Sequence, residues 1–146
     1  MKLAFASLLS LALAGCTIGR AVPYIPDPKY RAMTREDAKA ALAKAMQAAR
    51  TYENGPLQGV EIADASFTFR GAWGKRQLIA VPYAEGWPVL VTDVPMIPKE
   101  LKYAVQFARE DDSWIGPGGF YFNDLEAARR FVDAYAAVQF CAGKPP

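Results

Sequence analysis

The fold is decided by the stretch FYFNDLEAARRFVDAYAAVQFC, residues 120–141. Its first three residues are typical of a short buried strand, and the residues after them have the spacing of an amphipathic helix. Asn123 is the predicted N-cap, and Glu126 follows three residues later as in a capping box. The helix is expected to run to about Cys141, before Gly143 and Pro145. Its apolar stripe consists of Leu125, Ala128, Val132 and Tyr135, widened by Phe131 and Val138.

A second helix is expected over residues 34–52, which are rich in alanine and unbranched side chains. Thr34 is the predicted N-cap, and Glu36 and Asp37 place negative charge in the first turn. The turn Asn54-Gly55-Pro56 follows the predicted end. One face carries an apolar stripe, whose small residues favour close packing on a sheet: Ala38, Leu42, Ala45, Met46 and Ala49.

Between the two helices, short alternating runs broken by Gly and Pro indicate antiparallel strands. The expected strands are residues 60–62 continuing to 67–69, then 77–81, 89–92, 102–107 and 120–122. A hairpin loop is expected at 70–76 and a bend at 94–98. The predicted fold is therefore α+β, with an antiparallel sheet of five or six strands and an N-terminal and a C-terminal amphipathic helix in a single domain, residues 31–146.

The strand FYF that leads directly into the closing amphipathic helix is similar to the end of pleckstrin-homology-like folds. In those folds, such a helix closes an open barrel. The resemblance is topological, and it implies no functional residue.

The N-terminus carries an export signal. Met1-Lys2 precedes an apolar run at residues 3–14, and 12 residues at about 1.5 Å each are too short for a stable membrane span. The run ends in Leu13-Ala14-Gly15-Cys16, which resembles the lipobox of bacterial lipoproteins. The resemblance implies cleavage between Gly15 and Cys16, with Cys16 acylated by diacylglycerol as the mature N-terminus.

Three regions follow: a lipoprotein signal peptide at 1–15, an acylated tether at 16–30, and the domain. The prolines at positions 23, 26 and 28 predict a stiff, extended tether of up to about 40 Å. The membrane is therefore the expected partner of the acylated cysteine. In the sorting rule that the resemblance brings with it, Thr17 favours the outer membrane, with the domain facing the periplasm.

Composition excludes several kinds of site. The chain has no His and only two Cys, so His-based triads, His-ligated zinc and a CxxC redox pair are excluded, and no metal or cofactor is expected. After cleavage, 16 basic and 15 acidic residues remain. That balance gives no support to nucleic-acid binding.

The strongest candidate for a partner contact is the loop at 70–76, where three cations flank an indole: Arg70, Trp73, Lys75 and Arg76. This combination would suit an envelope protein or glycan. Cation–π stacking within the loop is the alternative that needs no partner. Trp87 and Trp114 would either join Trp73 in an aromatic surface or cap the core.

Two classes of function remain open. The first is a non-enzymatic lipoprotein that binds or supports another envelope component, including an inhibitor or immunity lipoprotein. The second is an enzyme that acts on glycan or lipid through two carboxylates about 5–10 Å apart. Its candidate groups are Glu61, Asp64, Glu85 and Asp93. A small apolar ligand between the helices and the sheet is a third possibility.

The remaining motifs favour structural roles. Ser66 and Ser113 lack an activating partner in the sequence, so neither is expected to be a nucleophile. Glu110-Asp111-Asp112 is typical of a solvated turn and not of a calcium loop. The glycine-rich residues 116–119 lead into a strand, so they also indicate a turn. Cys141 is expected to be a small buried apolar residue, with a reactive thiol as the alternative.

Overall fold

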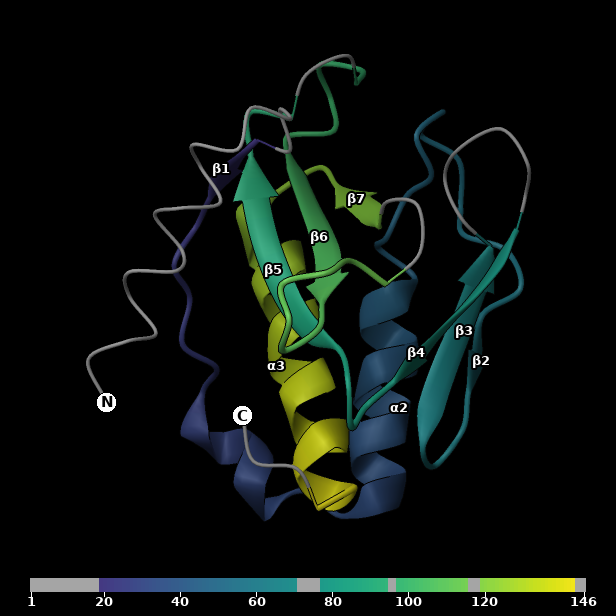
Figure 1. The fold of residues 1–146 in the computed structure, drawn as a ribbon, viewed down its shortest axis with the longest axis vertical. Helices are drawn as coiled ribbons and strands as arrows, with labels where there is room; N and C mark the ends of the chain where they lie inside the picture. The colour runs from purple at the N-terminus through teal and green to yellow at the C-terminus, as the bar shows by residue number, and fades with distance from the viewer. Residues whose placement is uncertain (1–18, 71–76, 95–96, 116–118, 144–146) are drawn as a thin grey trace.

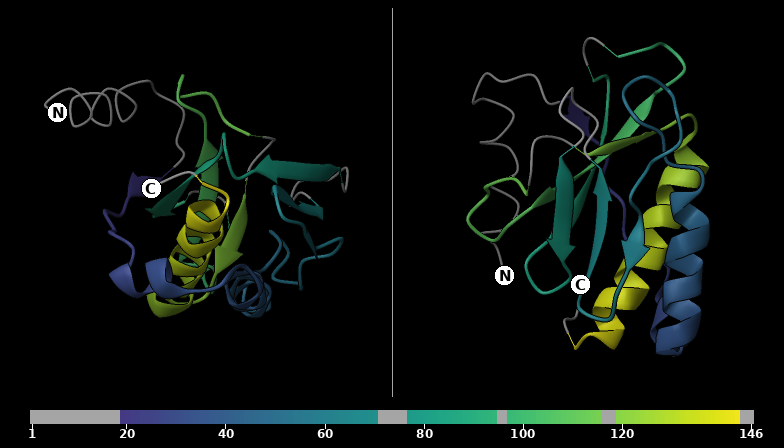
Figure 2. Two further views of the ribbon diagram at one scale, coloured as in Figure 1. Left: turned by 90° about the horizontal axis from the view of Figure 1, so that it is seen from below. Right: turned by 90° about the vertical axis from the view of Figure 1, so that its right-hand side faces the viewer.

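A computed structural model describes residues 19–70, 77–94, 97–115 and 119–143. Two antiparallel sheets form one layer, and the two helices form the other, as Figure 1 and Figure 2 show. The predicted combination of two helices with antiparallel strands is therefore confirmed. Among the described residues, no helix has the length and hydropathy that a membrane span requires.

The strands form two sheets and not one. The four-stranded sheet has the order β1-β5-β6-β7, and the three-stranded sheet has the order β2-β3-β4. The helical segments are η1 (Pro28–Ala32), α2 (Arg35–Met46) and α3 (Leu125–Cys141). The strands are β1 (Arg20–Ala21), β2 (Glu61–Ile62), β3 (Ser66–Arg70), β4 (Leu78–Pro82), β5 (Trp87–Thr92), β6 (Tyr103–Ala108) and β7 (Phe120–Phe122).

The prediction of one sheet was wrong because the chain turns a corner between β4 and β5. At this corner, side chains of α3 bind backbone carbonyls between β4 and β5. The Tyr135 hydroxyl donates to the Gly86 carbonyl at 2.9 Å. The Gln139 amide donates to the carbonyls of Gly86 at 2.8 Å and Tyr83 at 3.0 Å. These bonds satisfy buried polar groups and fix the corner on the closing helix.

Two element boundaries also differ from the prediction, and a third agrees with it. The run expected as one strand over 60–69 is two strands, because the chain reverses between Ile62 and Ser66 and pairs Ile62 with Phe67. The N-cap of α3 is Asp124 and not Asn123, since the Asp124 carboxylate accepts from the Ala127 N–H at 2.8 Å. The N-cap of α2 is Thr34, as predicted.

The first helix ends at Met46, six residues before the predicted end. The reason is a competing backbone interaction with β7. The Arg50 N–H donates to the Tyr121 carbonyl at 2.8 Å, and the Tyr121 N–H donates to the Arg50 carbonyl at 2.9 Å. Both groups are thereby paired outside the helix, so helix propensity does not decide where α2 ends.

The core is built from aromatic rings between the sheets and α3. Phe67 is fully buried, and its ring centroid lies 5.5–6.5 Å from the rings contributed by three other strands or turns and by α3. The closest pair joins Phe120 of β7 to Phe131 of α3 at 4.8 Å, edge to face. The fully buried rings of this cluster are Phe67, Phe69, Tyr83, Phe107, Phe120, Phe122, Phe131 and Tyr135. Such pairs stabilise beyond the area they bury.

Residues 19–33, here called the N-terminal segment, pack along the domain. Arg20 pairs with Thr92 and Ala21 with Val91, so β1 adds an edge strand to β5. Farther along, the Tyr24 hydroxyl donates to the Asp133 carboxylate at 3.0 Å, and Tyr30 is buried. Residues 19–30, which were predicted to be a stiff, extended tether, instead lie along the domain. The sequence pattern did not reveal the pairing of β1 with β5, because β1 has only two residues and depends on β5 for its hydrogen bonds.

Three tyrosines have raised pKa values in the folded chain, so we expect the protein to lose stability in alkali. Burial, then the hydrogen bond to Asp133, raises the pKa of Tyr24 to about 12. Burial also raises the pKa of Tyr83 and of Tyr135 well above the ordinary value. Each phenol holds its proton more tightly in the folded chain than in the unfolded chain, so the protonated tyrosines stabilise the fold. This contribution to the free energy of unfolding is complete below about pH 10 and is lost as the pH rises toward 12 and beyond.

The measurement is urea unfolding at a series of pH values, together with the absorbance of phenolate. We expect the unfolding midpoint to fall between about pH 10 and 12, and Tyr24→Phe to reduce that dependence. Phenols that all titrate near the ordinary pKa in the folded protein, with an unchanged midpoint, would contradict this account.

Candidate functional site: a groove on the helical layer

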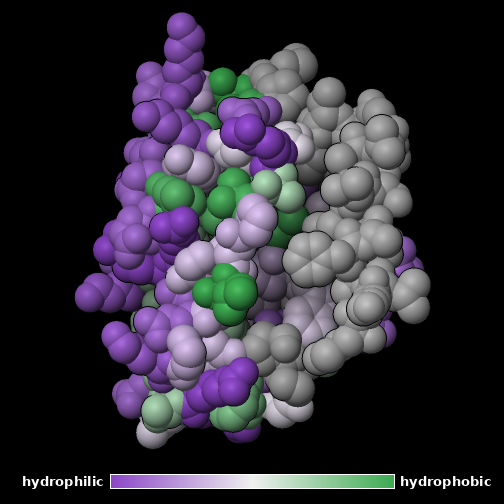
Figure 3. Space-filling view, turned by 90° about the vertical axis from the view of Figure 1, so that its left-hand side faces the viewer, coloured by the Kyte–Doolittle hydropathy of each residue, from purple (hydrophilic) through white to green (hydrophobic). Residues whose placement is uncertain are grey.

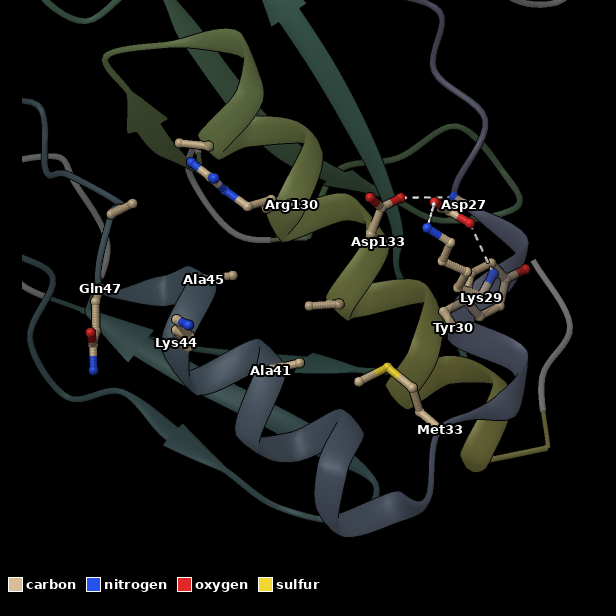
Figure 4. Close-up of a pocket in the computed structure, with 13 residues that line it drawn as sticks. Asp27, Lys29, Tyr30, Met33, Ala41, Lys44, Ala45, Gln47, Arg130 and Asp133 are labelled. Carbon is tan, nitrogen blue, oxygen red and sulfur yellow. Dashed lines mark hydrogen bonds and ion pairs between the residues drawn. The ribbon is translucent and has the colours of Figure 1, made fainter.

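A groove of about 800 Å³ lies where η1, α2 and α3 meet. Figure 4 shows the two helices in front, with the strands behind them, so the groove opens on the helical layer. The helices are antiparallel, because Arg35 at the start of α2 donates to the Cys141 carbonyl at the end of α3, at 3.2 Å. Side chains near the end of α2 therefore lie opposite those near the start of α3.

The floor of the groove is apolar because its residues are small. Ala41 and Ala45 lie four residues apart on one face of α2, and Ala48 follows in the turn after the helix. Across the groove, α3 contributes Ala127 and Ala134. Short side chains on both helices leave a trough where larger residues would fill the space between them.

One end of the groove is closed and internally satisfied. Tyr30 and Met33 line it from η1 and the residues after it. Asp133 accepts hydrogen bonds from the Tyr24 hydroxyl at 3.0 Å and from the Asp27 N–H at 2.9 Å. Asp27 in turn accepts from the Lys29 N–H at 3.0 Å. The carboxylates at this end are therefore committed to the N-terminal segment.

The other end carries two cations, Lys44 from α2 and Arg130 from α3 (Figure 4). Measured from the contact between Arg35 and Cys141, Lys44 lies about 14 Å along its helix and Arg130 about 17 Å along the other. The two therefore stand at nearly the same level on either side of the groove. Both are exposed, and within the described part of the chain neither makes a hydrogen bond or ion pair. The groove can thus accept an apolar body with an anionic group at this end.

The loop singled out from sequence is only partly described. Arg70 ends β3, while Trp73, Lys75 and Arg76 lie outside the described residues. The partner contact at this loop therefore stays a prediction.

The other two tryptophans lie together. Trp87 pairs with Ala108 across β5 and β6, and Ala108 forms a bridge with Trp114, so both indoles share one side of the sheet with Ala108 between them. Both are half-buried. Val89 and Ala104 share this face of the sheet, whereas Phe107 of the aromatic core points to the opposite face, so neither indole caps that core. The shared aromatic surface stays a prediction.

The candidate catalytic carboxylates do not converge as a set of four. Asp64 lies 3.0 Å from the Lys39 ammonium, and the hydrogen bond to Lys39 lowers the pKa of this carboxyl. Asp93 pairs with Arg20 at 3.2 Å. Glu85 and Asp93 flank opposite ends of β5, whose residues alone extend about 20 Å, so these two cannot face each other across a cleft. No described Cys, Asp or Glu residues form a group that could hold a metal ion.

The structure also places the smaller motifs. Glu110-Asp111-Asp112 is an exposed turn, as predicted, in which the Asp111 carboxylate accepts from the Ser113 N–H at 3.0 Å. Ser66 is half-buried in β3. Cys141 is half-buried against the core, with its sulfur 3.6 Å from the Met33 carbonyl oxygen, so the expected burial is only partial.

Comparison with protein-family models, with curated proteins and with solved structures gives no match for this chain. The groove was not predicted from the sequence, and of the alanines that line it only Ala45 belongs to the predicted packing stripe. The signal that could have indicated the groove is that residues 38–49 contain more alanines than the core buries. Ala38 and Ala49 are buried, whereas Ala41 and Ala45 are half-buried and Ala48 is exposed.

Proposed function

We propose that this chain is a lipid-anchored lipoprotein of the bacterial envelope whose domain binds another envelope component without catalysing a reaction. The observation that carries the anchor is the sequence Leu13-Ala14-Gly15-Cys16 behind a short apolar run. Two or three acyl chains on Cys16 would hold the protein on a membrane far more firmly than one chain can. With Thr17 after the cysteine, the proposed location is the outer membrane, with the domain facing the periplasm.

The groove supports the binding part of the proposal. It combines an apolar floor with Lys44 and Arg130, two cations that have no partner among the described residues. The ligand chemistry that fits is an apolar segment carrying an anionic group. The likeness of the closing strand and helix to pleckstrin-homology-like folds remains an expectation about topology and adds no ligand to this proposal.

The anchor predicts a specific effect of Cys16→Ser. We expect labelled palmitate to be incorporated into the wild-type protein and not into this variant, because the thiol that receives diacylglycerol is gone. The variant should also keep residues 1–15 and migrate as the larger species. Cys141→Ala is the matched control and should incorporate the label normally. Label that persists in Cys16→Ser would contradict the proposal.

The groove predicts that charge reversal abolishes partner recovery. We expect Lys44→Glu with Arg130→Glu to lower the amount of cross-linked envelope partner by at least about tenfold, which corresponds to the loss of charge-assisted contacts. The charge-preserving pair Lys44→Arg and Arg130→Lys should retain most of it. The measurement is mass spectrometry of material captured from solubilised envelopes.

A third variant separates the two candidate contacts. Replacing Arg70, Trp73 and Arg76 together with alanine should leave recovery unchanged if the groove is the contact. Recovery lost in this variant and kept in the groove variant would contradict the groove and favour the loop at 70–76.

A further inference from the structure

We propose that the end of the four-stranded sheet where β1 begins and β5 ends lies directly against the bilayer. This inference rests on the proposed acylation of Cys16. It replaces an expected tether of up to about 40 Å with a link of only a few residues, and so assigns the domain one orientation on the membrane.

The length of chain between anchor and domain sets the distance. Gly19 is the first described residue and already lies beside β5, so three residue steps separate it from Cys16. At no more than about 3.6 Å per residue, the two α-carbons are within roughly 11 Å of each other. The sheet end therefore cannot stand off from the lipid headgroups by more than this short link.

Close packing fixes the start of the N-terminal segment on β5. A β-carbon at Gly19 would lie 2.4 Å from the Thr92 carbonyl oxygen, and φ there is +100°, so the backbones approach in a way that only glycine allows. The Val22 N–H donates to the Leu90 carbonyl at 2.8 Å. Arg20 and Asp93 form an ion pair at 3.2 Å across the same two strands.

A second set of contacts holds the segment farther along, independently of β1. The Arg129 guanidinium lies 5.3 Å from the centroid of the Tyr24 ring, and the Tyr24 hydroxyl and the Asp27 N–H both donate to Asp133. Tyr30 is buried after that. The segment is therefore fixed at several points, and the link to the anchor cannot lengthen by the loss of one contact.

The membrane-facing end is defined here as Gly19, Arg20, Asp93, Lys99 and Lys102. Lys102 belongs to this end because the Thr92 hydroxyl donates to its carbonyl at 3.2 Å. Both lysines are exposed, as is Glu100 between them, and Arg20 is paired with Asp93, so this end keeps a small excess of positive charge that favours contact with anionic headgroups. Figure 1 shows the start of β1 and the arrowhead of β5 at the top, with η1 at the bottom. The η1 end of the groove is thus turned away from the bilayer.

The described surface along the N-terminal segment agrees with this orientation. Figure 3 shows that hydrophilic side chains predominate on this side of the molecule, with hydrophobic ones in small groups among them. Such a surface favours contact with water, so the membrane contact is expected at the end of the sheet and not along its flank.

The test is fluorescence quenching of the full-length protein, expressed with its signal sequence and extracted from membranes, in vesicles of phosphatidylcholine and phosphatidylglycerol that contain a lipid with a headgroup nitroxide. A fluorophore is attached at Lys99→Cys or, as the matched control, at Glu85→Cys, both in a Cys141→Ala background. Glu85 is exposed beyond the opposite end of β5. We expect quenching several-fold stronger at position 99 than at position 85.

A second variant keeps the inference falsifiable. A flexible Gly/Ser insertion of about 12 residues between Thr17 and Ile18 adds roughly 20 Å of reach and should abolish the difference between the two positions. Equal quenching at both positions with the native spacing, in protein that sediments with the vesicles, would overturn the inference alone. Protein that does not sediment with the vesicles would overturn the proposed acylation, and the inference with it.

Discussion

Phe67→Ala is expected to lower the free energy of unfolding by about 3–5 kcal/mol. The ring is fully buried and packs against Phe69, Tyr83, Phe107, Phe120, Phe131 and Tyr135, so its removal leaves a cavity at the centre of the aromatic core. Because typical domains are stable by only about 5–15 kcal/mol, this loss would bring the protein close to unfolding at ordinary temperature. The measurement is chemical denaturation of the domain, residues 19–146.

The matched control is Phe67→Leu, which keeps most of the apolar volume and should cost clearly less than the alanine variant. Leu78→Ala, at an exposed position on β4, should change the stability by less than about 1 kcal/mol. A Phe67→Ala protein that unfolds at the wild-type denaturant concentration would show that the rings do not pack as described.

Gly119→Ala is expected to destabilise the domain by about 3 kcal/mol or more, at the upper end of what overpacking costs. A β-carbon at this position would lie 1.8 Å from the Val105 carbonyl oxygen and 2.8 Å from its carbonyl carbon. Both are backbone atoms of β6, so no side-chain rotation relieves the overlap. β7 would have to move away from β6 and take Phe120 out of the core.

Gly55→Ala is the matched control for this prediction, because its nearest neighbour would be the Thr51 hydroxyl at 3.4 Å, an ordinary contact. We expect it to change the free energy of unfolding by less than about 1 kcal/mol. The measurement is thermal unfolding of both variants beside the wild type. Equal melting temperatures for the two alanine variants would contradict the close approach of β6 and β7.

The elements that could be predicted are those whose signals are local. The closing helix was predicted because its apolar spacing is strong over 17 residues, and the start of α2 because Thr34 caps it. The prediction failed where contacts between residues far apart in the sequence determine the end of a helix or the arrangement of the strands. The pairing of Arg50 with Tyr121 ends α2, and the bonds from Tyr135 and Gln139 to Gly86 hold the corner between the two sheets.

The packing of the N-terminal segment on the domain also could not be predicted from local sequence patterns. Its prolines favour an extended backbone, and the backbone is indeed extended at Asp27. An extended chain can stand free in water or lie along a sheet edge, and proline content does not distinguish the two. The contact of Tyr24 with Asp133 joins residues 109 positions apart, so no local pattern could reveal it.

The candidate groove depends on packing that a sequence does not contain. Whether an alanine on an amphipathic helix fills a tight interface or leaves a trough depends on what covers it. In this fold η1 closes one end, and nothing in the described chain covers the floor between Lys44 and Arg130. The lipobox, by contrast, is a local motif and could be proposed from sequence alone.

The most direct test of the account is the mass of the N-terminal peptide from protein extracted from membranes. We expect this peptide to begin at Cys16 and to carry a diacylglyceryl group on sulfur. A mature chain that begins at another residue, or a peptide with an unmodified Cys16, would contradict the lipid anchor and the membrane orientation derived from it.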